Sequence, residues 1–205
     1  MLLNGSFGKV NEEQKNIIQK IYQRNKYLIS LINDLLDNAK LEETAYACHL
    51  APVDLEDIIE SAIKFHEEEV KMKSIILAFE KPAVKLPKIM LDKGRMYLAI
   101  LNIIDNAIKY THKGGTITIS LRKNKESAEF KIQDSGIGIP ENQKKHLFDK
   151  FFRANNAIKV EIVGSGLGLF IAKSIIESHH GKIWFDSKEN QGSIFFFSLP
   201  IKPLS

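Results

Sequence analysis

The chain has 205 residues, of which 44% are hydrophobic and 26% are charged, and it carries one cysteine and a formal net charge of +4. This composition excludes disordered, collagenous and coiled-coil chains, and it suffices for one globular domain with an appendage. Acidic and basic residues alternate along the sequence, so the modest charge reflects solvation and does not indicate a nucleic-acid partner. A single cysteine excludes an internal disulfide framework and a thiolate metal cluster.

The sequence contains no apolar run near the roughly 18 residues that a membrane-spanning helix needs. It also lacks, at its start, the basic-then-apolar pattern of a signal peptide. We therefore expect a cytoplasmic chain. A longer parent protein could still be anchored at the cytoplasmic face of a membrane.

The first predicted element is one long amphipathic helix from Val10 to Leu41. Its apolar residues recur at three- and four-residue steps, and charged residues fill the opposite face. A lone helix of this length cannot bury its apolar stripe, so we expect a partner helix, another chain or both. The pattern breaks around residues 50–53, and we place a domain boundary near Ala47, which separates residues 1–46 from residues 47–205.

The second segment alternates groups of strands with single helices. Turn residues, helix caps and the period of apolar residues predict helices over residues 54–71, 92–110 and 167–179, and strands over residues 75–79, 116–121, 128–134, 182–186 and 193–199. Strands grouped in hairpins, with helices between the groups, are typical of an α+β fold. We predict a two-layer sandwich in which a mixed, mostly antiparallel sheet carries helices on one face, preceded by the long N-terminal helix.

The helix ending at Tyr110 carries polar residues that share one face. Asn102, Asn106 and Lys109 are spaced i, i+4 and i+7 among apolar neighbours. Two carboxamides and an ammonium on one stripe offer neutral oxygen ligands for Mg²⁺ and a cation for phosphate. Taken alone, however, such a stripe is more often a solvated polar face.

The turn from Asp134 to Pro140 places a carboxylate at the end of a strand, followed by two glycines that allow close backbone approach. An ionised aspartate only accepts hydrogen bonds, which suits an exocyclic amine such as adenine N6. A plain surface turn is the alternative. The alternating Ile137 and Ile139 favour a buried role, because a solvent-exposed turn gains little from two β-branched residues.

A glycine-rich loop from Gly164 to Leu169 runs directly into the next predicted helix. Backbone N–H groups and the positive end of a helix then face the loop, which is the arrangement of a phosphate cradle. The spacing departs from the dinucleotide fingerprint, a Walker loop is absent, and none of the protein-kinase signature loops occurs.

In this order, the three segments resemble the N, G1 and G2 boxes of sensor histidine kinases, members of the ATPase superfamily shared with gyrase, Hsp90 and MutL. Residues 102–111 match the N box nearly throughout, residues 148–153 look like the F box, and Gly192 and Ser193 with Phe195 look like the last glycine box. The resemblance covers about residues 54–200. Each box is weakly specific alone, but the ordered set is highly specific.

The resemblance implies Mg-ATP as the cofactor and a role for each matching residue. Asn106 would be the main Mg²⁺ ligand with Asn102 in support, and Lys109 and Arg153 would contact phosphates. Asp134 would hold the adenine amine, and residues 149–165 would form a mobile lid. The remaining residues of the implied binding set are Tyr110, Gly136, Gly138, Ile139, Gly164, Ser165, Gly166, Leu167 and Gly168.

One position bears on the reaction, because the ATP-hydrolysing relatives place a glutamate general base where Asn102 stands. An amide cannot take a proton from water. The resemblance instead implies phosphoryl transfer to a histidine, whose neutral imidazole is already nucleophilic. We therefore expect little intrinsic ATPase activity.

The phosphoacceptor motif of that family is absent from this sequence. None of the six histidines lies in it: His49, His66, His112, His146, His179 and His180. The helix from Val10 resembles the second helix of the family's dimerisation hairpin. We therefore expect a chain that cannot phosphorylate itself, from a homodimeric parent whose partners are its own acceptor hairpin and a response-regulator receiver domain. His179 and His180 before Gly181 resemble the family's helix-ending His-Gly, which implies a helix cap rather than a metal site.

Two other functions are also compatible with the sequence. The first is an anti-sigma-factor-type kinase of the same superfamily, which phosphorylates serine; the long N-terminal helix argues against it. The second is a scaffold that binds nucleotide poorly and acts only by interaction, which the intact Asn106, Lys109 and Asp134 disfavour.

Overall fold

The computed structural model describes residues 49–160 and 164–201, together with Asn11, Gln14, Ile17, Ile18 and Ile21. Gln14 and the three isoleucines are helical, whereas Asn11, which falls within the predicted helix, is not. The other residues of the helix predicted from Val10 to Leu41 lie outside the described residues. The division of the chain after residue 46 therefore stays a prediction. Among the residues that are described, no helix is both long and apolar enough to cross a membrane.

Five strands form the main sheet, in the order β2-β4-β5-β7-β6. They are β2 (Ile76–Glu80), β4 (Thr116–Asn124), β5 (Ser127–Asp134), β6 (Lys182–Ser187) and β7 (Ser193–Pro200). β2 runs parallel to β4, and every other neighbouring pair is antiparallel. The mixed, mostly antiparallel sheet predicted from the sequence is thereby confirmed.

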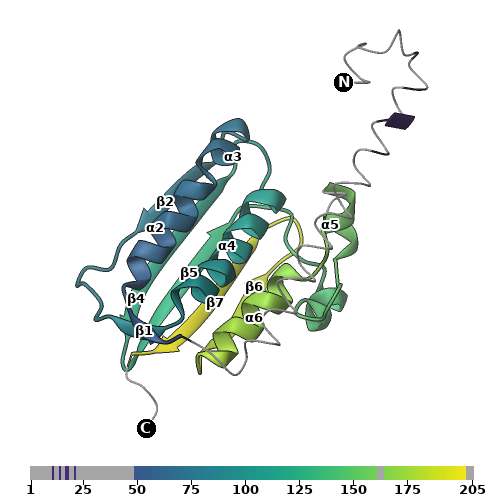
Figure 1. The fold of residues 1–205 in the computed structure, drawn as a ribbon. Helices are drawn as coiled ribbons and strands as arrows, with labels where there is room; N and C mark the ends of the chain where they lie inside the picture. Colours follow the sequence, from purple (N-terminus) through teal and green to yellow (C-terminus); the bar gives the residue numbers. More distant parts are fainter. Residues whose placement is uncertain are drawn as a thin grey trace.

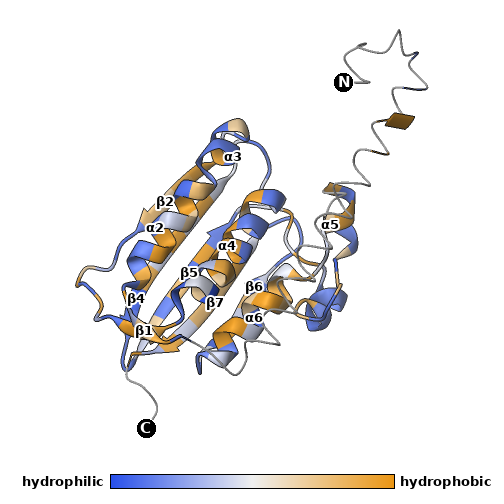
Figure 2. Cartoon of the chain, viewed as in Figure 1, coloured by the Kyte–Doolittle hydropathy of each residue, from blue (hydrophilic) through white to orange (hydrophobic). Residues whose placement is uncertain are grey.

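The long helices all cover one face of this sheet (Figure 1). They are α2 (Leu55–Phe65), α4 (Lys93–Tyr110) and α6 (Gly168–Ser178). Figure 2 shows hydrophobic and hydrophilic residues in alternation along these helices, as expected for elements that bury one side. The α+β two-layer sandwich is confirmed for the described part of the chain.

The hydrophobic core lies between the sheet and the helices. Along β5 and β7 every second side chain is buried, which matches the two-residue period of a strand with one covered face. Phe130 of β5 stacks on Phe197 of β7 with ring centroids 4.6 Å apart, and both rings are fully buried. Such a pair adds about 0.5–1.5 kcal/mol beyond its area burial and fixes the register of the two central strands.

The structure corrects the predicted helix over residues 54–71. His66 leaves helical geometry, with φ −94° and ψ 6°, so α2 ends at Phe65 and a second helix, α3 (Glu67–Met72), begins after it. Both pieces carry helix-favouring residues, so composition does not reveal the break.

Four short elements were not predicted. Two are the strands β1 (Ala51–Val53) and β3 (Ile89–Leu91), which pair with each other in antiparallel fashion. The others are the 3₁₀ helix η3 (Glu141–His146) and the helix α5 (Asn155–Val160). Strands of three residues and helices of six are too short to display a period.

His179 joins the end of α6 to the start of α4. Its ring Nδ1 lies 2.8 Å from the carbonyl oxygen of Ile175, and its Nε2 accepts a hydrogen bond from the backbone N–H of Asp92 at 3.0 Å. The carbonyl only accepts and the N–H only donates, so Nδ1 carries the proton of a neutral ring. Asp92 in turn caps α4 by accepting from the N–H of Arg95. Burial lowers the pKa of His179.

We expect His179 to make stability depend on pH. Because its pKa is lowered in the folded chain, its contribution is present above the unfolded-state pKa of about 6.5 and is lost as the pH falls from that value through the lower folded-state pKa. Urea denaturation at pH 7.5 should show His179→Gln to be about 1–2 kcal/mol less stable than wild type.

This difference in unfolding free energy should shrink as the pH is lowered to 5. His180→Gln, which alters the exposed neighbouring histidine, should leave the unfolding free energy nearly unchanged. A wild-type advantage over His179→Gln that stays constant across this pH range would contradict the neutral buried ring.

Candidate nucleotide-binding site

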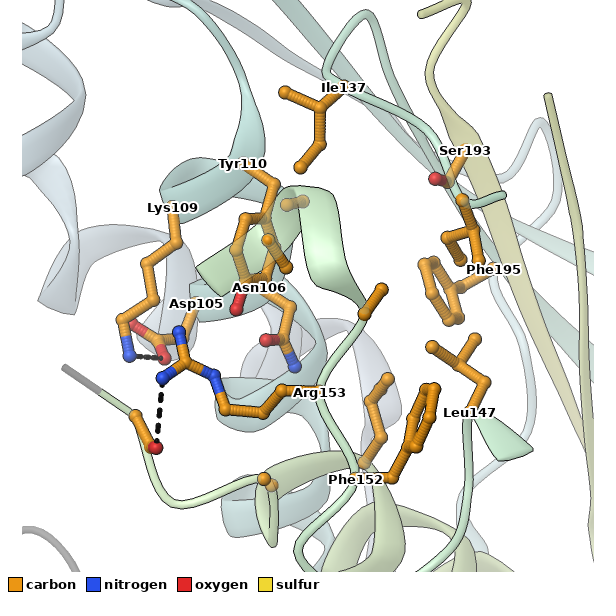
Figure 3. Close-up of a pocket in the computed structure, with 18 of the residues that line it drawn as sticks. Asp105, Asn106, Lys109, Tyr110, Ile137, Leu147, Phe152, Arg153, Ser193 and Phe195 are labelled. Atoms are coloured by element: carbon orange, nitrogen blue, oxygen red, sulfur yellow. Dashed lines mark hydrogen bonds and ion pairs between the residues drawn. The ribbon is translucent and has the colours of Figure 1, made fainter. Parts of the chain in front are cut away.

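A cavity of about 260 Å³ opens between α4, the turn after β5, the segment around α5 and the start of α6. All the residues of the predicted binding set line it except Gly136 and Leu167. The helix α4, the Asp134 turn and the glycine loop are far apart in sequence, and the fold brings them to one place (Figure 3).

The wall formed by α4 presents the predicted polar face. The Nδ2 group of Asn106 donates a hydrogen bond to the backbone oxygen of Asn102, 2.9 Å away. This bond leaves the amide oxygen of Asn106 as the atom that offers lone pairs to a ligand. Asn102 lies against the start of α6, since a Cβ added to Gly168 would be 3.1 Å from its Oδ1.

Lys109 lines the cavity and forms an ion pair with Asp105, a residue that the sequence analysis did not single out. Its Nζ lies 2.6 Å from Oδ2 of Asp105, which also lines the cavity (Figure 3). Lys73 steadies the same turn of α4, because its Nζ donates to the carbonyl oxygens of Ile108 and Lys109 at 2.8 and 2.9 Å. A cation at the negative end of a helix is favourable.

Asp134 ends β5 as a buried carboxylate, 8% exposed. Its Oδ1 accepts hydrogen bonds from the N–H of Gly136 at 2.8 Å and from the N–H of Ser193 at 3.2 Å. Oδ2 therefore remains to accept a bond from a ligand. Burial nevertheless dominates and raises the pKa of Asp134 to about 6.

The turn after Asp134 needs its glycines for close packing. Gly138 has φ +60°, and an added Cβ would lie 2.0 Å from the backbone oxygen of Lys188. Gly136 does not line the cavity; it lies beneath Tyr110, whose carbonyl oxygen would be 2.3 Å from an added Cβ. Ile137 and Ile139 are buried, as predicted, and line the cavity.

The glycine loop places the start of α6 at the cavity. The helix begins at Gly168, one residue later than predicted, and no side chain caps its first turn. Leu167 is buried in the core instead of lining the cavity, and its N–H donates to the Ser165 hydroxyl at 3.1 Å. Backbone N–H groups at the start of a helix with no side-chain cap form an anion-binding site.

Arg153 closes the cavity from the side of the predicted lid. Its Nη1 donates to the carbonyl oxygen of Gly164 at 3.3 Å (Figure 3). Gly166, at φ +74°, packs directly on the backbone of Phe151, where an added Cβ would meet the carbonyl carbon at 2.6 Å. The lid and the glycine loop are thus in contact, while the predicted mobility of the lid stays a prediction.

Several further residues line the cavity. Asn156 donates from Nδ2 to the backbone oxygen of Gly138 at 2.9 Å, which ties α5 to the Asp134 turn. The others are mainly apolar: Ala107, Leu147, Phe152, Ala154, Ala157, Leu169, Ser193 and Phe195. Ser193 and Phe195 belong to the last glycine box noted in the sequence. Ala107, Phe152 and Leu169 lie in the N box, the F box and the glycine loop. The remaining residues carry only a general apolar signal, which does not distinguish a pocket wall from a core.

A deep carboxylate, two helix amides, cations and the start of a helix around one cavity define a nucleotide-binding domain. The family model of histidine kinase-, DNA gyrase B- and HSP90-like ATPases matches residues 91–203. The chain belongs to this family, and it carries the catalytic ATP-binding domain of a histidine kinase.

Similar proteins agree with this assignment. The circadian input-output histidine kinase CikA of Synechococcus elongatus is 30% identical over 204 residues, which are 99% of this chain and 27% of that protein. The adaptive-response sensory kinase SasA of Synechocystis is 32% identical over 196 residues, which are 93% of this chain and 50% of that protein. The chain thus spans half or less of the length of these two relatives.

Solved structures share the fold. The catalytic domain of the histidine kinase ThkA has a TM-score of 0.65 and 29% identity over 75% of this chain and 97% of its own. Full-length ShkA in complex with AMPPNP has a TM-score of 0.74 and 26% identity over 100% of this chain and 44% of its own. ThkA in complex with the response regulator TrrA has a TM-score of 0.75 and 23% identity, covering 98% of this chain and 57% of its own.

We expect Asp134→Asn to separate stability from nucleotide binding. The pKa of Asp134 is raised, so its stabilising contribution is present below the unfolded-state pKa of about 3.9 and is lost as the pH rises through about 6. At pH 7.5 the buried charge destabilises the fold. An asparagine keeps the Oδ1 acceptor without that charge.

At pH 7.5 the Asp134→Asn variant should be as stable as wild type or more stable, by up to about 1–3 kcal/mol in urea denaturation. It should bind adenine nucleotides about tenfold more weakly, or worse, in calorimetry, because the charged acceptor is lost. A destabilised variant with unchanged nucleotide affinity would contradict the assigned role.

Proposed function

We propose that this domain transfers the γ-phosphate of Mg-ATP to a histidine on a separate helical hairpin, from which it passes to an aspartate of a response regulator. The observation that carries the proposal is the cavity, where the two α4 amides, Asp134 and the start of α6 face one space. The names of the relatives, a circadian histidine kinase and a sensory kinase, support the same function.

The cavity offers a distinct group for each part of the nucleotide. We assign the adenine amine to Oδ2 of Asp134, and we place Tyr110 against the nucleotide. We assign the phosphates to the N–H groups at the start of α6 and to the cations Lys109 and Arg153. Donors and cations fixed in advance stabilise charge that develops on a transferring phosphoryl group.

The metal assignment rests on the α4 amides. The Oδ1 of Asn106 is a neutral oxygen held in place by the bond from Nδ2 to Asn102, and one or two protein oxygens plus phosphate and water suit Mg²⁺. Asn106 would hold the ion with Asn102 in support. A bound Mg²⁺ would neutralise phosphate charge, while the protein groups orient the nucleotide.

Transfer to histidine fits the residues of α4 better than hydrolysis does. The amide of Asn102 cannot act as a general base, so the cavity activates water poorly. A neutral imidazole needs no deprotonation and requires mainly correct positioning. The acceptor hairpin and a receiver domain are therefore the proposed partners, within a homodimeric, cytoplasmic or cytoplasm-facing parent.

The direct test mixes the chain with labelled ATP and a separately prepared phosphoacceptor hairpin. We expect label on the hairpin that is labile to acid and stable to base, as for a phosphohistidine. Asn106→Ala should lower the transfer rate by about 100-fold or more through loss of the metal ligand. Label on serine would instead favour an anti-sigma-type kinase, and equal transfer by Asn106→Ala would contradict the metal assignment.

A second prediction concerns hydrolysis without an acceptor. Release of inorganic phosphate from ATP by the purified chain should stay close to the level of a buffer blank, because position 102 holds an amide instead of a carboxylate. Rapid turnover that is lost in Asn102→Ala would overturn the phosphotransfer mechanism.

A further inference from the structure

Outside the nucleotide cavity, one histidine and two carboxylates converge where the break between α2 and α3 meets α4. One ligand atom from each of His66, Glu69 and Asp105 lies within 4.8 Å of the others. The Nδ1 atom of His66 is 3.6 Å from Oε2 of Glu69. His66 is 6% exposed, and the other two side chains are 35% and 27% exposed.

The buried ring of His66 is the unexplained member of this cluster. Its Nε2 is shielded from solvent and has no hydrogen-bond partner within the described part of the chain. Leaving such a polar atom unsatisfied costs about 1–3 kcal/mol. The 3.6 Å contact between Nδ1 and Glu69 leaves Nε2 unaccounted for, and an imidazole beside two carboxylates is a donor set suited to a divalent metal ion.

We propose that His66, Glu69 and Asp105 bind a divalent transition-metal ion such as Zn²⁺, with water completing the coordination. Imidazole and carboxylate are ligands for this class of metal. His66 and Glu69 stand three residues apart around the start of α3, and Asp105 comes from the neighbouring α4. Three protein ligands, from the break between α2 and α3, from α3 and from α4, leave an open position for water.

A bound metal would draw the three ligand atoms closer together. Atoms bound about 2.0–2.2 Å from one metal are at most about 4.4 Å apart, so any pair near the 4.8 Å limit of this cluster must move closer. Asp105 can move closer by loosening its 2.6 Å bond to Lys109. The metal and Lys109 therefore compete for one carboxylate, which links this site to the wall of the nucleotide cavity.

The proposed site does not include Asn106, although its third ligand, Asp105, also lines the nucleotide cavity. Neither His66 nor Glu69 lines the nucleotide cavity. Metal binding here can therefore be measured without nucleotide, and it stands or falls independently of the phosphotransfer function.

The test is a titration of the whole chain with Co²⁺ and with Zn²⁺ in the absence of nucleotide, followed by visible absorption and calorimetry. We expect one equivalent of metal to bind, with the absorption bands of a coordinated Co²⁺ ion. Glu69→Gln and Asp105→Asn should each weaken binding by about tenfold or more. Glu68→Gln and His112→Gln, which change an exposed acid and an exposed histidine, should bind as wild type does.

Two further variants sharpen the result. Lys109→Met should tighten metal binding because it removes the competitor for Asp105, and Asn106→Ala should leave metal binding unchanged. His66→Gln should also weaken binding by about tenfold or more, and because the ring is buried, its thermal unfolding must be checked alongside Glu69→Gln. No saturable binding, or binding undiminished in both Glu69→Gln and Asp105→Asn, would overturn the proposal.

Discussion

The organisation of this domain depends on the division of α4 into two unlike sides. One side buries Met96, Ile100, Ile103, Ala107 and further apolar residues in the core between the helices and the sheet. The other side carries Asn102, Asn106 and Lys109 along the cavity. Because the buried side fixes the rotation of the helix, the polar groups are positioned by hydrophobic packing rather than by contacts with one another. Caps at both ends, from Asp92 and Lys73, hold the helix in register.

The opposite side of the cavity is held by backbone contacts that leave no room for side chains. Gly138 meets the backbone of Lys188, and Gly166 meets the backbone of Phe151. The loops can thus approach each other closely enough to enclose a nucleotide. Burial raises the pKa of Asp134, which lines the cavity. A buried group with a shifted pKa is typical of a functional site.

The sequence predicted the fold wherever an element is long enough to show a period. The helix α4 and the strands β5 and β7 lie within a residue or two of their predicted bounds, although Asp92, expected as the first helical residue, is the N-cap. The short pair β1 and β3 was missed because three residues show no clear alternation. The break at His66 was missed because it depends on tertiary contacts and interrupts a run of good helix formers.

The candidate site was predicted in outline and not in its supporting contacts. Glycine turns and paired amides leave a pattern, so Asn106, Asp134 and Gly166 could be proposed from spacing and singled out by the order of the motifs and their family resemblance. Asp105 could not, because a charged residue on a helix is usually a solvated one. Lys73 could not either, since its contact with α4 crosses 35 and 36 residues of sequence to Ile108 and Lys109. Leu167 sits within the glycine loop yet faces the core, a distinction that spacing cannot make.

The most direct test of the nucleotide site is calorimetric titration of the chain with ATP, with and without Mg²⁺. If the cavity is the ATP site, one equivalent of ATP should bind, and Mg²⁺ should strengthen binding in wild type but not in Asn106→Ala. Undetectable binding of Mg-ATP by a folded chain would contradict the central claim and would favour a scaffold that acts by interaction alone.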